Sequence, residues 1–134
     1  MMFKDVLTDI LTEFSLPSWT TKNIDMYPND YQGSISNEKE YCRISVFPSA
    51  SANIAHGAKK SLSGTVIVKI FVETGEGQSR LMEIAEALDS VLQNKKLTRG
   101  TELYTSFINV EGLDPSNPAL TSATYIIPFT LYGE

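Results

Sequence analysis

The amino-acid sequence predicts an α+β fold, in which a mostly antiparallel sheet of four to five strands carries two helices packed on one face. Two segments repeat apolar residues at the spacing of an amphipathic helix, and four others alternate with the period of two that a strand requires. Along the chain the order is helix, strands, helix, strands, without repeated alternation of single strands and helices. This order favours an antiparallel sheet covered by helices on one side.

The first predicted helix covers residues 3–14 and is expected to stop before Pro17, because a proline inside a helix removes a hydrogen bond. The second covers residues 78–94, and Lys95 and Lys96 then suit the negative end of its dipole. Each helix carries one apolar stripe. The stripes are Phe3, Val6, Leu7, Ile10, Leu11 and Phe14 in the first helix, and Leu81, Ile84, Ala85, Leu88, Val91 and Leu92 in the second.

Four segments are predicted as strands, and residues 23–27 are a candidate for a short fifth. Residues 62–72 alternate so regularly that they are expected to form a central strand, with residues 41–47 beside them. Residues 102–110 and 121–132 supply the other two strands. Because Pro128 cannot donate a ladder hydrogen bond, the last strand is predicted to lie at a sheet edge or to contain a bulge.

One interruption stands out in what otherwise reads as a single domain covering residues 1–134. Fourteen residues from Pro48 to Ser61, mostly small, connect two strong strands that a two-residue turn would suffice to join. Loops of this length are uncommon inside compact domains and are usually functional or disordered. We therefore expect an adaptable contact element here, with a tolerated disordered insertion as the alternative.

Composition restricts the classes of partner and the compartment. The net charge of −5, with no cluster of basic residues, argues against nucleic acid as the main partner. A single cysteine excludes an intrachain disulfide and suits a reducing cytoplasm. The acidic, amphipathic first residues do not resemble a secretory signal, and no apolar run approaches the length of a membrane span. A soluble cytoplasmic product is expected.

No constellation of residues predicts catalysis, a metal site or a cofactor. His56 is the only histidine and lies in the small-residue connection, while Cys42 falls on the apolar face of a strand, where a buried structural thiol is expected. One cysteine and one histidine cannot build a usual zinc site. The sequence GEG at 75–77 precedes a helix, as phosphate-binding loops do, but position 80 is arginine and Glu76 would repel a phosphate.

The remaining candidates are contact residues. We expect Trp19 to be either an anchor on a partner or a cap on the end of the core, since tryptophan is common in both settings. The other candidates lie in the small-residue connection, where small side chains approach a partner closely, an isoleucine offers an apolar anchor and two lysines meet acidic groups. They are Ile54, His56, Gly57, Lys59 and Lys60.

Taken together, segment 41–46 (YCRISV), the connection with Ile54 and Gly57, segment 63–72 (SGTVIVKIFV) and GEG at 75–77 before an apolar helix resemble a known family. The chain is similar to the tail terminator proteins of long-tailed bacteriophages, such as the minor tail protein U of lambda-like phages. The likeness extends from the first helix to the closing strand. It consists of element order, size and a few short patterns.

This resemblance implies a structural virion subunit rather than an enzyme. Members form a hexameric ring on the end of the tail tube, end its polymerisation and offer a surface to head-completion or neck proteins, without a cofactor. A ring requires two different patches on each subunit, and we expect the edge strand at 121–132 to supply one. Head–tail connector and tail tube component are the neighbouring alternatives. A further alternative is a ligand-binding or hydrolytic domain using Cys42 or His56 in a cleft between the second helix and the sheet.

Overall fold

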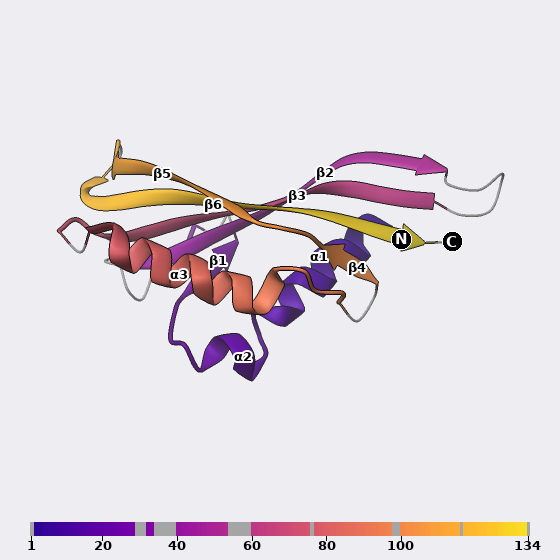
Figure 1. Ribbon diagram of the computed structural model, residues 1–134, viewed down its shortest axis with the longest axis horizontal. Coiled ribbons are helices and arrows are strands. Elements are labelled where there is room, and N and C mark those ends of the chain that lie inside the picture. The colour runs from indigo at the N-terminus through magenta and orange to yellow at the C-terminus, as the bar shows by residue number, and fades with distance from the viewer. Residues whose placement is uncertain are drawn as a thin grey trace.

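The computed structural model of the protein describes residues 2–28, 32–33, 40–53, 60–75, 77–97, 100–115 and 117–133. Within these residues the chain forms one mixed six-stranded sheet and three helices, and the helices lie on one side of the sheet (Figure 1). The fold is therefore α+β, as predicted. It has one more strand and one more helix than expected.

The helices are α1 (Met2–Glu13), α2 (Pro17–Thr20) and α3 (Gly77–Leu92). Helices α1 and α3 lie where the apolar stripes predicted them. The sequence pattern does not predict α2, because in that pattern Pro17 indicates only the end of the first helix. Proline also suits the first turn of a helix, where its missing N–H has no partner to lose, and Pro17 occupies that position in α2.

The strands are β1 (Met26–Pro28), β2 (Tyr41–Asn53), β3 (Lys60–Glu73), β4 (Thr101–Leu103), β5 (Phe107–Asp114) and β6 (Asn117–Gly133). Their order in the sheet is β1-β2-β3-β6-β4, and β5 also pairs with β6. Strand β1 is parallel to β2, which makes the sheet mixed, and the other pairs are antiparallel. The predicted strand at 102–110 is two strands, because residues 104–106 leave the ladder between β4 and β5.

The prediction that the last strand lies at an edge is wrong. Strand β6 is central, with β3 on one side and β4 and β5 on the other. Tyr104 donates its backbone N–H to the carbonyl of Pro128 at 3.1 Å. Since the N and C=O of one strand residue face the same neighbour, the nitrogen of Pro128 faces the interruption between β4 and β5. The sheet thus accommodates the proline centrally at the one place where no donor is needed.

The small-residue connection is shorter than predicted. Strand β2 continues to Asn53 and β3 begins at Lys60, and the two stay paired along this length after a register shift between Pro48 and Ala50. Pairing with β3 overrides the weak strand preference of alternating alanine and serine. Of the predicted contact residues here, Lys60 is the first residue of β3, and Ile54, His56, Gly57 and Lys59 lie outside the described residues.

The core lies between the helices and the sheet. Helix α3 contributes a stripe in which no residue is more than 7% exposed, and the facing positions of β3 and β6 are similarly buried. Helix α1 is tied to β4 by the side chain of Asp9, which accepts hydrogen bonds from the Thr101 hydroxyl at 2.8 Å and its backbone N–H at 3.3 Å. The largest fully buried side chains include Tyr125, Phe129, Ile10, Leu62, Ile70, Leu81, Ile84, Leu88 and Leu92.

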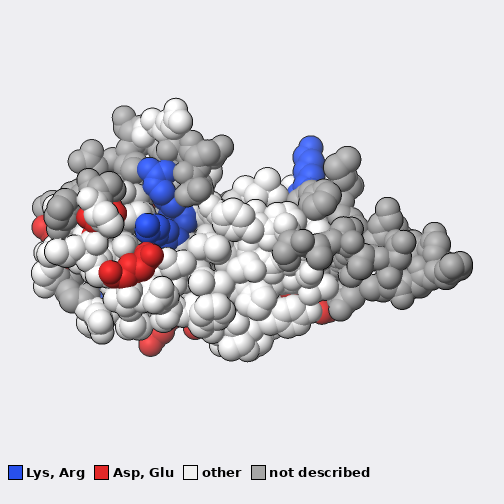
Figure 2. Space-filling model, turned by 90° about the horizontal axis from the view of Figure 1, so that it is seen from above, with Lys and Arg blue, Asp and Glu red and all other residues white. Residues whose placement is uncertain are grey.

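No helix of the described residues covers the other face of the sheet. Figure 2 looks onto this side, where the described surface is largely uncharged; most of the basic side chains gather at one end beside acidic ones, and one basic side chain stands apart from them. Arg43 on β2 and Lys69 on β3 are cross-strand partners, and the Lys69 ammonium lies 4.0 Å from the carboxylate of Glu111 on β5. This face and the two sheet edges are the surfaces that the helices leave open.

Candidate functional site

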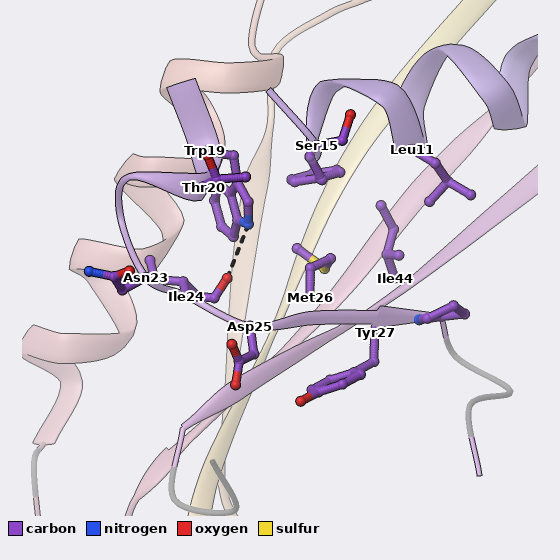
Figure 3. A pocket seen from close by; sticks show the side chains of 12 residues that line it. Leu11, Ser15, Trp19, Thr20, Asn23, Ile24, Asp25, Met26, Tyr27 and Ile44 are labelled. Atoms are coloured by element: carbon purple, nitrogen blue, oxygen red, sulfur yellow. Dashed lines mark hydrogen bonds between the residues drawn. The ribbon is translucent and has the colours of Figure 1, made fainter. Parts of the chain in front are cut away.

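The structure has a hollow beside α2 with a volume of about 400 Å³. It lies between the end of α1, the turn after α2 and strand β1, and polar side chains mix with apolar ones around it (Figure 3). The lining residues are Leu11, Phe14, Ser15, Trp19, Thr20, Asn23, Ile24, Asp25, Met26, Tyr27, Pro28 and Ile44. The hollow is open to solvent, and its one carboxylate, Asp25, is only half-buried.

Trp19 forms the wall of this hollow as a core residue. Its side chain is only 2% exposed, and its ring meets Phe14 edge to face with the centroids 5.0 Å apart. The indole N–H donates to the carbonyl of Ile24 at 3.1 Å (Figure 3). Of the two roles considered for Trp19, this geometry supports the cap on the core, because little of the ring is left for a partner to contact.

A second groove, with a volume of about 340 Å³, follows the edge of the sheet. Its lining is mainly apolar: Leu7 and Leu11 of α1, Pro28 at the end of β1, and Ile44, Ser45, Val46 and Phe47 of β2. Phe47 is 50% exposed and Leu7 44% exposed. Leu7 and Leu11 belong to the apolar stripe predicted for α1, yet they are not covered by this chain.

A polar cluster fastens α3 to the sheet. Asp89 accepts hydrogen bonds from the Tyr125 hydroxyl at 2.6 Å and from the Ser106 hydroxyl at 2.5 Å, and Ser106 also contacts Gln93 at 2.8 Å. Burial, and then the hydrogen bond to Asp89, raise the pKa of Tyr125 well above its ordinary value. A tyrosine held protonated against a carboxylate is a structural link between α3 and β6.

The segment before α3 is arranged for turning the chain rather than for phosphate. Gly75 has a φ of +109°, which only glycine adopts freely. At the start of α3 the guanidinium of Arg80 binds the carboxylate of Glu40 with a contact of 2.8 Å and that of Glu83 at 3.0 Å. The side-chain hydrogen bond to Glu40 is the main cause of the raised pKa of Arg80. Arg80 is thus engaged by two carboxylates of its own chain.

Cys42 is fully buried on β2, among the core residues. Burial raises the pKa of the thiol far above its usual range, with the nearby charge of Glu40 adding to the effect. The thiol is therefore protonated at neutral pH, whereas the thiolate is the nucleophile and metal ligand. The structure does not bring it to the hollow beside α2, and its supposed companion His56 lies outside the described residues.

This placement predicts that the thiol reacts only when the chain unfolds. At pH 8 we expect Cys42 of the native protein to be inert towards Ellman's reagent for hours, because its raised pKa and its burial both suppress the reactive thiolate. In denaturant, one thiol per chain should react within minutes. Labelling within minutes at native circular dichroism would contradict the prediction.

Neither a membrane span nor a metal cluster occurs in the described parts of the chain. No helix there combines the length and hydropathy needed to cross a bilayer. No group of three or more histidine, cysteine, aspartate or glutamate side chains is placed to hold a metal ion, again among described residues.

Comparison with solved structures shows that other proteins share this fold. No protein-family model matches the chain, and no curated protein matches it. Among solved structures, a chain described only by a sequence identifier has a TM-score of 0.68 at 13% identity, covering 97% of this chain and 95% of its own. Another, from the virion of a native gene transfer agent particle, has a TM-score of 0.59 at 9% identity, covering 94% of this chain and 93% of its own.

Sequence reasoning missed the groove along β2. All of its residues except Pro28 lie in segments for which the sequence predicts the correct element, but the stripe on α1 is expected from the sequence to be buried as a whole. The stripe itself carries no signal of the groove, because α3 has an equally wide stripe, six apolar residues in twelve positions, that is buried throughout.

Proposed function

We propose that this protein is a structural virion subunit that forms a ring on the end of a phage or phage-like tail tube and terminates it. The observation that carries the proposal is the likeness of the fold, over nearly the full length of both chains, to a chain of the gene transfer agent virion. A gene transfer agent is a phage-like particle, so the likeness supports a structural role in a virion. The resemblance of the sequence to tail terminators supports the finer assignment.

The described surface suits a protein that acts by fitting against other subunits rather than by catalysis. The hollow beside α2 is open to solvent and mixes polar with apolar side chains, and the two acidic groups with raised pKa values, the Cys42 thiol and the Tyr125 hydroxyl, are held in the protonated form inside the fold. The open apolar groove and the helix-free sheet face suit contacts with other subunits. In this proposal the partners are copies of the same chain, the tube protein and a head-completion protein, and no cofactor takes part.

Deleting the gene from the phage or prophage that encodes it tests the proposal. Without a terminator, tube polymerisation has no stop, so electron microscopy of induced lysates should show tails longer than normal and of uneven length, without heads. Supplying the intact protein from a plasmid should restore both the normal length and the attachment of heads.

The same micrographs separate the neighbouring roles. Loss of a tube protein would leave no tubes, and loss of a head–tail connector would leave tails of normal length beside unattached heads. Either result would overturn the terminator assignment and keep the virion role. Normal infectious particles without the gene would overturn both.

A further inference from the structure

The described sheet has two open edges on opposite sides. Among the described residues, strand β1 pairs with β2 only from Cys42 to Ile44, and no other described strand lies on that side of β2 from residue 45 to residue 53. The backbone N–H of Cys42 donates to the backbone carbonyl of Asp25 at 2.9 Å, on the β1 side of β2. Because every second residue of a strand directs its backbone N–H and C=O to the same side, the backbone groups of Val46 face the open edge. On the far side, β6 is the one strand of the described residues that pairs with β5. Unpaired edges of this kind are templates for another strand.

The two edges fit each other in direction and length. Strands β2, β3, β6 and β5 alternate in direction across the sheet. If β5 of one copy lies beside β2 of the next, with both sheets facing the same way, the alternation continues as an antiparallel pair. Strand β5 has 8 residues, close to the length of the open part of β2. This contact joins different patches on the two copies, as a ring requires.

The apolar side chains of the two edges also match. Phe107 and Leu113 on β5 are 59% and 58% exposed. Phe107 points away from the helices, opposite Ile126, whereas the register shift after Val110 places Leu113 opposite Thr121, on the helix side. Phe47 on β2 is exposed on the same face as Phe107. On the helix side, Ile108 and Val110 of an added β5 would lie towards the groove lined by Leu7 and Leu11. Both layers of the contact are then apolar.

Charge favours the same pairing over a two-fold contact between two β5 edges. Strand β2 contains one cation, Arg43, and no carboxylate, whereas β4 and β5 contain Glu102, Glu111 and Asp114 and no cation. Glu102 and Glu111 lie 3.9 and 4.0 Å from lysines of their own chain, and exposed pairs at such distances contribute little. Two β5 edges together would bring like charges close, but β5 against β2 does not.

From these observations we infer that the open edge of β2, with the groove beside it, binds strand β5 of a second copy of this chain. The inference rests on the proposed ring and names the contact that builds it. Pro48, with no N–H, lies within the open part of β2 and removes a possible donor. The pairing is therefore interrupted, which suits subunits that associate weakly when free.

Two variants test the contact, one on each edge: Phe47→Lys and Leu113→Lys. We expect wild-type protein to form oligomers larger than dimers in sedimentation velocity as its concentration approaches about 1 mM, and each variant to associate at least about tenfold more weakly. A mixture of the two variants should form a dimer and nothing larger, because Phe47→Lys retains its β5 edge and Leu113→Lys its β2 edge. Leu16, 40% exposed and at neither edge, provides the matched control as Leu16→Lys, which should assemble like wild type.

Three outcomes overturn the contact: a wild-type protein that stays monomeric, edge variants that assemble like Leu16→Lys, or a mixture that restores full oligomers. Melting temperatures of both variants establish that loss of assembly is not loss of folding. Tail lengths in complemented lysates separate this inference from the proposed function. If both edges are needed for oligomers but tails are of normal length without the gene, the contact stands and the terminator role fails. If both variants restore normal tails, the contact fails and the terminator role stands.

Discussion

Replacing Gly64 with alanine is expected to destabilise the protein by about 3 kcal/mol or more, a large share of the stability of a domain of this size. Gly64 lies in β3 opposite Pro48, where β2 approaches closely. A Cβ at this position would overlap the carbonyl oxygen of Phe47 and would lie 2.8 Å from both Cα of Pro48 and the ring of Phe129. Two of these three neighbours are backbone, so the strain cannot be relieved by turning a side chain.

Chemical denaturation followed by circular dichroism measures this loss. The matched control is Thr65→Ala, one position further along β3, where the side chain is half-buried on the helix-free face. We expect that variant to lose less than about 1 kcal/mol, since only strand propensity and a partial contact change. Equal stability of the two variants would contradict the close approach of β2 and β3 at Gly64.

Replacing Trp19 with alanine is expected to cost about 3–5 kcal/mol, the usual range for removing a large buried aromatic side chain. The change removes the edge-to-face contact with Phe14 and leaves the carbonyl of Ile24 without its indole donor. The segment from α2 to β1 has few other anchors, because α2 is only 4 residues long. We therefore expect this segment to become susceptible to limited proteolysis at temperatures where the rest of the domain is folded.

Trp19→Phe is the control, because it retains an aromatic ring and loses the N–H. Its expected cost is about 1–2 kcal/mol. A cap on the core predicts this graded loss in the isolated chain. Were Trp19 chiefly an anchor for a partner, alanine would leave the melting temperature unchanged and weaken only assembly, which calorimetry and sedimentation on the same samples distinguish.

Local structure was predicted well where the spacing of apolar residues is compatible with only one kind of secondary structure. The alternation of residues 62–72 and the stripe of residues 78–94 correspond to β3 and α3, both central to the core. Prediction was less successful where a residue, such as proline, is compatible with two different local structures. Pro17 suits both a stop and a first turn, and Pro128 suits both an edge and a gap in the neighbouring ladder.

The strand order and the open groove could not be predicted from local sequence patterns, for a different reason. The position of β6 between β3 and β5 depends on pairings between residues far apart in the chain, such as Lys60 with Gly133. The length of β2 past Phe47 likewise depends on β3 being available as a partner, since alanine and serine do not favour a strand by themselves. The groove exists because β1 ends at Pro28, and three residues carry too little pattern to predict that end.

The central place of β6 has a consequence for synthesis of the chain on the ribosome. Strands β1, β2 and β3 are translated first, but the open side of β3 stays unpaired until β6, more than forty residues later, has emerged. At a translation rate of about 5–20 residues per second, the nascent chain exposes an apolar strand edge for several seconds. During this interval the acidic segment 73–89, with five carboxylates against one arginine, is the part of the growing chain most able to keep neighbouring nascent chains apart.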